Sequence, residues 1–157
     1  MTPAVKQIKK EKIAYTLHEY THDSHCESYG SEAAHKLGVI EERVFKTLVI
    51  NTHDMQLAVA IIPVSQKLNM KLAAKALNTK KTNMADSAIV ERSTGYVLGG
   101  VSPLGQKKTL KTIIDESAQQ YSTIYVSAGK RGLELELSAD DLKQLCNAKF
   151  VPLSQNF

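Results

Sequence analysis

The sequence predicts one α+β domain with a curved, mixed, barrel-like β-sheet and helices around its periphery. At 157 residues the chain fits a single domain with a real buried core. Strand-like and helix-like segments both occur, but without the regular strand–helix–strand order of a doubly wound fold. No internal repeat, linker or low-complexity stretch interrupts them. We therefore expect residues 1–157 to form one domain.

The first half of the chain is expected to pair two strands as a hairpin between helices. Thr2 caps a helix that begins at Pro3, whose fixed φ suits the first helical position. The segments 44–50 and 55–62 are rich in β-branched and apolar residues and are joined by a polar turn. The other expected elements are a strand at 14–20, a loop at 21–30, a helix at 32–37 capped by Ser31 and ended by Gly38, and a helix at 70–77.

The second half is expected to alternate helices with short strands. Asp86 caps a helix over 87–93, and Gly95 ends it. Ser138 caps the last helix, over 139–146. The expected strands are β-branched or apolar segments, and they lie at 111–115, 123–127 and 133–137.

Composition and charge predict a cytoplasmic protein with a mild bias toward anionic partners. Twenty basic side chains against sixteen acidic ones give a net charge of +4, which favours encounter with RNA phosphates without requiring it. The longest apolar run, 57–64, contains a proline and is too short to cross a bilayer, and the charged N-terminus does not resemble a signal peptide. Cys26 and Cys146 lie far apart, as expected for reduced thiols. We expect no membrane partner and no DNA partner.

The most informative stretch is 92–108, which is expected to run from a helix end through a short apolar strand into a glycine-rich loop. Three glycines surround Pro103, so the backbone can adopt positive φ and approach a ligand closely. Loops of this kind bind ligands through main-chain N–H groups. The glycine spacing resembles a phosphate-binding P-loop, but Gln106 stands in place of the lysine that this motif requires.

The same stretch carries a resemblance to a known family. Its sequence, RSTGYVLGGVSPLGQKK, resembles the central motif of the YbaK family of free-standing aminoacyl-tRNA editing proteins, which are related to the editing domain inserted in prolyl-tRNA synthetases. Further similarity is found in MTPAVK, FKTLV, KTNMAD and TIYVSAGKRGLELEL, so that it extends over almost the whole chain. The resemblance implies the fold of that family, an aminoacyl-tRNA substrate, and no metal or other cofactor.

Lys46 is the main candidate for a catalytic residue. It interrupts the apolar strand VFKTLVI, where a lysine either reaches the surface from an edge or is held partly buried for a purpose. The resemblance implies the second, because the lysine of this motif is the family residue most closely tied to catalysis, and Thr47 beside it matches as well. The loop from Gly99 to Pro103 has the G-x-x-x-P form that lines the family's editing pocket.

The resemblance also assigns the remaining pocket residues. Tyr29 and Glu134 stand where relatives often carry Phe and Asp, so the roles of these two positions stay open. Lys130 and Arg131 are expected to contact phosphates of the tRNA acceptor end, although the pattern alone fits a solvated turn. The expected site comprises Lys46, Gly99 and Gly100 as catalytic residues, and Tyr20, Tyr29, Gly30, Thr47, Val101, Ser102, Pro103, Ser127 and Glu134 as substrate-binding residues.

A short cluster in the loop at 21–30 raises the question of a metal. His22, His25 and Cys26 are residue types that bind zinc. The cluster has no second pair of ligands elsewhere in the sequence, and its spacing matches no standard zinc motif. A polar loop is therefore favoured over a metal site.

The sequence offers no recognisable protein nucleophile. It contains no G-x-S-x-G motif with a partnered histidine and acid. An ester between an amino acid and the 3′-terminal ribose of tRNA is already activated, so main-chain N–H groups of the loop at 99–103 can stabilise charge on its carbonyl oxygen. Pocket fit separates cysteine poorly from alanine or serine, whereas attack by the cysteine's own thiol sorts substrates by their chemistry. The YbaK family is understood to deacylate Cys-tRNA(Pro) in this cyclising way.

We therefore predict a trans-editing enzyme that removes cysteine from tRNA(Pro), with prolyl-tRNA synthetase as the partner that supplies tRNA selectivity. Two alternatives remain open. A sibling enzyme would clear alanine from tRNA(Pro) and would act well on a substrate without a thiol. A non-catalytic module would hold aminoacyl-tRNA or a synthetase without hydrolysis, and loss of activity in a Lys46→Ala variant would argue against it.

Overall fold

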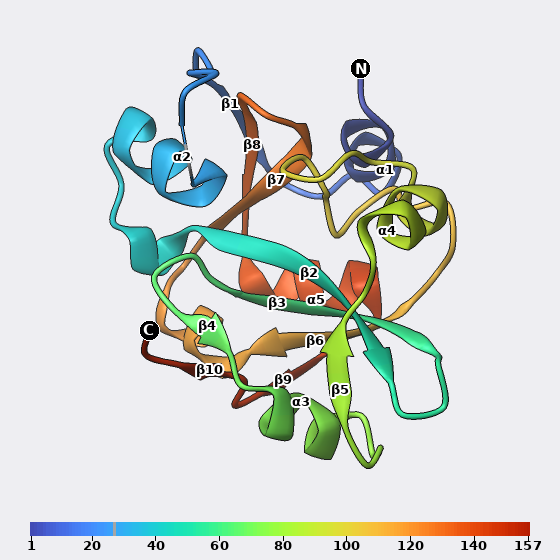
Figure 1. The fold of residues 1–157 in the computed structure, drawn as a ribbon. Coiled ribbons are helices and arrows are strands. Elements are labelled where there is room, and N and C mark those ends of the chain that lie inside the picture. Colours follow the sequence, from blue (N-terminus) through green and yellow to red (C-terminus); the bar gives the residue numbers. More distant parts are fainter. Residues whose placement is uncertain (27) are drawn as a thin grey trace.

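The computed structural model describes residues 1–26 and 28–157, which fold around three β-sheets (Figure 1). The helical elements are α1 (Pro3–Lys10), α2 (Tyr29–Leu37), η1 (Glu41–Arg43), α3 (Met70–Ala76), α4 (Ser87–Thr94), η2 (Glu116–Gln120) and α5 (Ala139–Cys146). The strands are β1 (Thr16–Glu19), β2 (Phe45–Thr52), β3 (Leu57–Pro63), β4 (Lys67–Leu68), β5 (Thr82–Met84), β6 (Lys111–Asp115), β7 (Ile124–Lys130), β8 (Leu133–Leu137), β9 (Lys149–Val151) and β10 (Ser154–Gln155). The predicted α+β class is confirmed, while no closed barrel forms in this part of the chain.

The largest sheet has the strand order β5-β2-β3-β6-β9 and is mixed, as predicted. The predicted hairpin is its centre: β2 and β3 pair antiparallel from Phe45 opposite Pro63 to Asn51 opposite Leu57. β6 then pairs parallel to β3, and β9 pairs parallel to β6. A second, antiparallel sheet has the order β1-β8-β7, and β4 pairs with β10 in a third.

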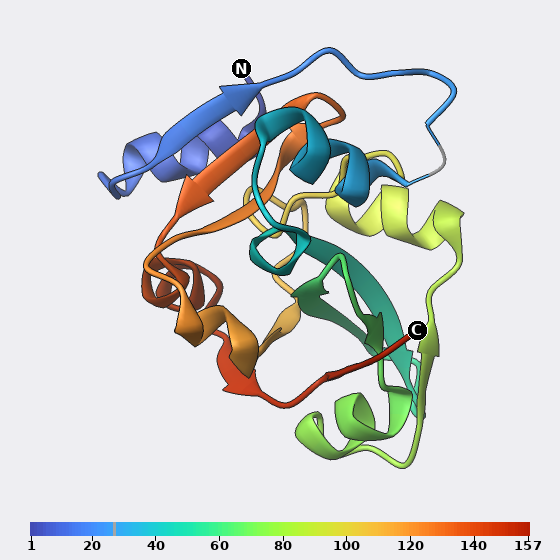
Figure 2. The ribbon, with the colours of Figure 1, turned by 90° about the vertical axis from the view of Figure 1, so that its left-hand side faces the viewer.

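The hairpin is buried on both faces, which fixes the direction of every side chain in it. One face packs against the three-stranded sheet, α1 and α5 in the main core, which includes Phe45 and Val49. The other face packs against α3 and β4 in a second cluster, which includes Ile50 and Ile62. Figure 2 shows the two sides, with α3 on one side of the sheet and α1 on the other. Because side chains alternate along a strand, neighbours in β2 lie on opposite faces.

Capping residues define most of the helix ends, as the sequence predicts. The Thr2, Asp86 and Ser138 side chains each accept a hydrogen bond from a main-chain N–H in the first turn of their helix. Gly38 and Gly95 end α2 and α4 with left-handed backbone conformations. None of the described helices is long and apolar enough to traverse a bilayer.

Two predicted features differ in the structure, and both bear on the site. The helix expected at 32–37 begins earlier, at Tyr29 with Ser28 as its N-cap, so Tyr29 and Gly30 belong to its first turn. The early start brings Gly30 against Val64, where an added Cβ would lie 2.2 Å from a Val64 methyl carbon. The short apolar strand expected after α4 does not form, and residues 95–110 follow an irregular path instead.

Candidate active site

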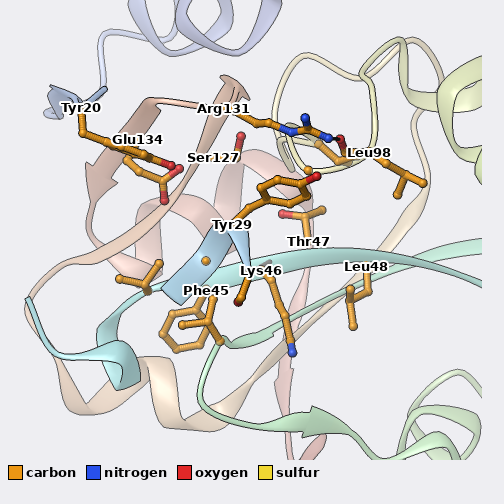
Figure 3. A pocket seen from close by; sticks show the side chains of 16 residues that line it. Tyr20, Tyr29, Phe45, Lys46, Thr47, Leu48, Leu98, Ser127, Arg131 and Glu134 are labelled. Carbon is orange, nitrogen blue, oxygen red and sulfur yellow. Dashed lines mark hydrogen bonds between the residues drawn. The ribbon is translucent and has the colours of Figure 1, made fainter. Parts of the chain in front are cut away.

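A cavity of about 520 Å3 opens where the start of β2, the first turn of α2, the loop at 95–110 and the β7–β8 hairpin meet (Figure 3). These segments are far apart in sequence, and their meeting point lies at the edge of the main core. The lining residues are Tyr20, Ser28, Tyr29, Gly30, Val44, Phe45, Lys46, Thr47, Leu48, Val64, Leu98, Gly99, Val101, Ser127, Arg131 and Glu134. We call this space the central cavity.

Most of the expected site residues line the central cavity, but four do not. Ser102 and Pro103 belong to the loop but are buried, and the Ser102 hydroxyl accepts a hydrogen bond from the Leu104 N–H at 3.2 Å. Gly100 also lies outside the lining, and its N–H donates to the Val97 carbonyl at 3.0 Å. This bond makes Gly100 unsuited to be a donor to substrate. Lys130 lines a neighbouring cavity instead.

Gly99 allows the loop to approach the rest of the site closely. It occupies the third position of the turn closed by the Gly100–Val97 hydrogen bond, with φ of +88°, a conformation that favours glycine. A Cβ at Gly99 would lie 2.6 Å from both Arg131 Nε and a ring carbon of Tyr29. The loop, Arg131 and Tyr29 can therefore pack this closely only because residue 99 is a glycine.

Arg131, from the β7–β8 hairpin, contacts both the loop at 95–110 and the first turn of α2. Its guanidinium lies over the Tyr29 ring, 4.0 Å from the ring centroid, and Nη2 donates to the Leu98 carbonyl at 2.8 Å. This hydrogen bond and the stacking contact fix the guanidinium beside the loop and α2. The arginine is thus a structural bridge as well as a cation at the cavity wall.

Lys46 contributes to the lining, but its amine does not point into the centre of the cavity. The alternation along β2 places Lys46 on the face opposite to Thr47, and Figure 3 shows the amine directed away from Thr47 and Ser127. Its Nζ lies 5.1 Å from the ring centroid of Phe157. Burial lowers the pKa of Lys46 from its ordinary value, which marks a partly desolvated ammonium at the rim.

Two hydroxyl groups, those of Thr47 and Ser127, line the part of the cavity that the Lys46 amine points away from. The Thr47 hydroxyl is buried without a hydrogen-bond partner among the described residues, so a ligand in the cavity would satisfy it. The Ser127 hydroxyl accepts from the Gly129 N–H at 3.1 Å. A register shift between Ser127 and Lys130 interrupts the β7–β8 ladder here, and such bulges turn side chains toward sites.

Glu134 is the acidic side chain of the lining. It lies opposite Ser127 in the β7–β8 ladder and is buried, with 7% of its surface exposed. Burial raises its pKa to about 8, because the carboxylate would be poorly solvated there. The Tyr20 ring lies beside it in Figure 3, and burial together with the Glu134 charge raises the pKa of Tyr20 to about 12. A protonated carboxyl is therefore available at neutral pH.

The residues of the suspected metal cluster have other contacts. His22 Nδ1 lies 2.7 Å from Glu32 Oε1, and the Cys26 thiol donates to the Ser28 carbonyl at 3.0 Å. Although burial alone would raise the pKa of Glu32, hydrogen bonds from His22, from the Asp23 N–H and from a lysine lower it to about 2. Among residues 1–26 and 28–157, no group of three potential metal ligands is found.

Sequence reasoning missed Ser28 and the apolar part of the lining. Ser28, Val44, Phe45, Leu48, Val64 and Leu98 were not expected to belong to the site. Their place depends on tertiary contacts, such as the hydrogen bond from the Val64 N–H to the Val44 carbonyl at 2.8 Å. The weak signal for Val44, Phe45 and Leu48 was their position around Lys46 in one strand.

The chain with this fold and this cavity matches a known protein family. Residues 23–145 match the model of the aminoacyl-tRNA editing domain family. The chain belongs to this family.

Known relatives extend the match over nearly the whole chain. It is 38% identical over 154 residues to the Enterococcus faecalis protein named "Putative Cys-tRNA(Pro)/Cys-tRNA(Cys) deacylase EbsC", covering 98% of this chain and 93% of that protein. The fold is similar to that of the hypothetical protein APE2540, with a TM-score of 0.88, 23% identity and coverage of 98% and 100% of the two chains. It is also similar to "a putative trans-editing enzyme for prolyl tRNA synthetase", with a TM-score of 0.84, 19% identity and coverage of 99% of both chains.

Proposed function

We propose that the protein removes cysteine from mischarged tRNA(Pro) by cleaving the aminoacyl ester, with the substrate's own thiol as the nucleophile. The observation that supports this most is the chemistry of the central cavity. It combines a buried carboxyl of raised pKa with an unpaired hydroxyl, and neither histidine nor cysteine is among its described lining residues. Such a cavity suits an activated ester that brings its own nucleophile.

The glycine loop is proposed to hold the carbonyl oxygen of the ester. Gly99 and Val101 line the cavity, and their N–H groups are the candidates for the oxyanion site. Gly100 is not included, because its N–H is bound to Val97. One such donor contributes on the order of 3 kcal/mol to the transition state.

Glu134 is proposed to carry the proton. A free cysteine thiol has a pKa of about 8.5, and the pKa of about 8 at Glu134 is close enough for easy exchange between the two. The ionised fraction of Glu134 takes the thiol proton, the sulfur attacks the carbonyl carbon, and a carbon–sulfur bond forms. The ester carbon–oxygen bond breaks, Glu134 returns the proton to the ribose oxygen, and a cyclic thioester leaves together with free tRNA.

The cations around the cavity are proposed to hold the tRNA end. Lys46 stands at the rim, where its ammonium can bind an oxygen of the terminal nucleotide. Lys130 and Arg131 line an adjacent cavity. They are the candidates for binding the phosphates that precede the terminal nucleotide. Selection of tRNA(Pro) in the cytoplasm is assigned to prolyl-tRNA synthetase as partner, because a small chain has little surface for reading tRNA identity.

The test is release of amino acid from Cys-tRNA(Pro) and Ala-tRNA(Pro), each with and without the protein. Rapid loss of cysteine with little loss of alanine is expected. Equal turnover of both esters would instead favour the alanine-clearing alternative, which the small cavity residues Gly30 and Gly99 also allow. No turnover of either ester, with tRNA still bound, would favour a binding module.

A further inference from the structure

Two further cavities adjoin the central cavity, and they differ in charge. One, of about 340 Å3, shares Tyr20 and Arg131 with the central cavity and also contains Lys130. The other, of about 690 Å3, shares Ser28 and Val64 and is walled by α2, η1 and Phe157. We call the second one the Phe157 cavity. A ligand in the central cavity can extend into either.

Phe157 presents an aromatic face to solvent beside the active site. It is 79% exposed, so the face of its ring is open to a ligand. The pairing of β10 with β4 leads the chain to this position, and Lys46 lies next to the ring. An exposed aromatic ring next to a cation is the arrangement on which single-stranded nucleic acids stack their bases.

The other walls of the Phe157 cavity favour a neutral base over a phosphate. Val39 and Ile40 provide apolar surface, and Glu41 and Glu42 provide carboxylates that repel phosphate and accept hydrogen bonds from an amino group. The described lining residues include His35 but no lysine or arginine, and the Lys46 ammonium lies beside the Phe157 ring. The Ser65 hydroxyl, also in the lining, is buried without a partner in the part of the chain that the structure describes.

We propose that the Phe157 cavity binds the adenine base of the tRNA's terminal nucleotide. The proposal rests on the proposed function, because it takes the aminoacyl ester as the occupant of the central cavity. Base and ester are attached to one ribose, so the base must enter a cavity that adjoins the ester directly. The amino group of adenine faces Glu41 or Glu42, its ring stacks on Phe157, and the preceding phosphates leave through the cationic cavity at Lys130.

The experiment compares two small substrates, the cysteinyl ester of adenosine and the cysteinyl ester of a methyl riboside that lacks the base. Stacking of one base changes kcat/KM by about tenfold or more, so the wild-type protein is expected to prefer the adenosine ester by about that factor. Phe157→Ala is expected to abolish the preference, and Phe157→Trp to retain it. Met55→Ala serves as a control, since Met55 is 69% exposed at the far end of the β2–β3 hairpin.

Binding of adenosine alone, followed by chemical-shift changes in NMR spectra, gives a readout that needs no turnover. Binding that weakens in Phe157→Ala supports the proposal, even if no ester is cleaved and the proposed function therefore fails. Equal turnover of the two esters by the wild-type protein overturns the base site and leaves the proposed function standing. Loss of the preference in Lys130→Ala but not in Phe157→Ala would place the base in the cationic cavity and likewise overturn the proposal.

Discussion

The guanidinium of Arg131 lies 4.0 Å from the ring centroid of Tyr29, and the same guanidinium donates to the Leu98 carbonyl. Arg131→Lys keeps the charge but loses the planar stack and the fixed hydrogen bond. We expect kcat/KM for aminoacyl ester cleavage to fall about tenfold, since a cation–π contact and a hydrogen bond contribute roughly 1–2 kcal/mol together. Arg92→Lys, at an exposed position of α4, is the matched control. A fall of the same size in both variants would contradict the bridging role.

Gly99→Ala tests the close packing of the loop. The new methyl group would meet Tyr29 and Arg131, in a backbone conformation that already disfavours alanine. We expect kcat/KM to fall about a hundredfold, since the loop is proposed to supply an oxyanion donor. Gly38→Ala is a matched control, because its φ is also positive but an added Cβ meets nothing within 4 Å. That control should lose about 1 kcal/mol of unfolding free energy from backbone strain and keep its activity.

Stability should depend on pH through Glu134. Its pKa is about 8 in the folded protein and 4.5 without burial, so the folded state binds more protons between these values. Stability is therefore expected to fall as pH rises from about 4.5 to 8, by about 5 kcal/mol at most. Glu134→Gln keeps the shape without ionising and should flatten this part of the profile. Urea unfolding measured at several pH values checks this, with Glu91→Gln at an exposed position as control.

The Glu134→Gln variant also tests the proton carrier. The amide cannot take the thiol proton, so turnover of the cysteinyl ester is expected to fall at least about a hundredfold. Substrate binding should change little, because the side chain keeps its size. An unchanged kcat at pH 7 would remove Glu134 from the mechanism.

Lys46→Ala tests the cation at the rim. A hydrogen bond to a charged group contributes about 1.5–3 kcal/mol, so kcat/KM is expected to fall about tenfold to a hundredfold. Because the amine points away from the centre of the cavity, the effect should lie in KM more than in kcat. Lys67→Ala, exposed on β4, is the control. A loss confined to kcat would mean that the amine turns inward to the reacting ester.

The sequence allowed the framework to be predicted because its signals were local. The hairpin of β2 and β3 and the caps at Thr2, Asp86 and Ser138 depend on neighbouring residues alone. Strands of two or three residues, such as β4 and β10, carry too little pattern to be recognised. The start of α2 was missed for another reason: Ser28 and Ser31 are both suitable N-cap residues, and the helix begins after the first of them.

The candidate site was predictable as a set of residues but not as a geometry. The motif marked Gly99 to Pro103 as one unit, yet the Gly100 N–H donates to the Val97 carbonyl and Ser102 is buried away from the cavity. The direction of Lys46 follows from alternation along β2, and the sequence pattern did hold that information. The apolar walls and the cavity beside Phe157 exist only where distant segments meet, so no local pattern marks them.

The proposed mechanism needs the substrate's own thiol as the nucleophile, and S-methylation of the substrate removes that nucleophile. The initial rate of amino acid release would be measured for Cys-tRNA(Pro) and for the same tRNA carrying S-methylcysteine. The methyl group leaves the ester intact and removes the thiol proton. We predict rapid release of cysteine and release of S-methylcysteine no faster than without protein. Equal rates for the two would contradict it and would require a water molecule or a protein group as the nucleophile.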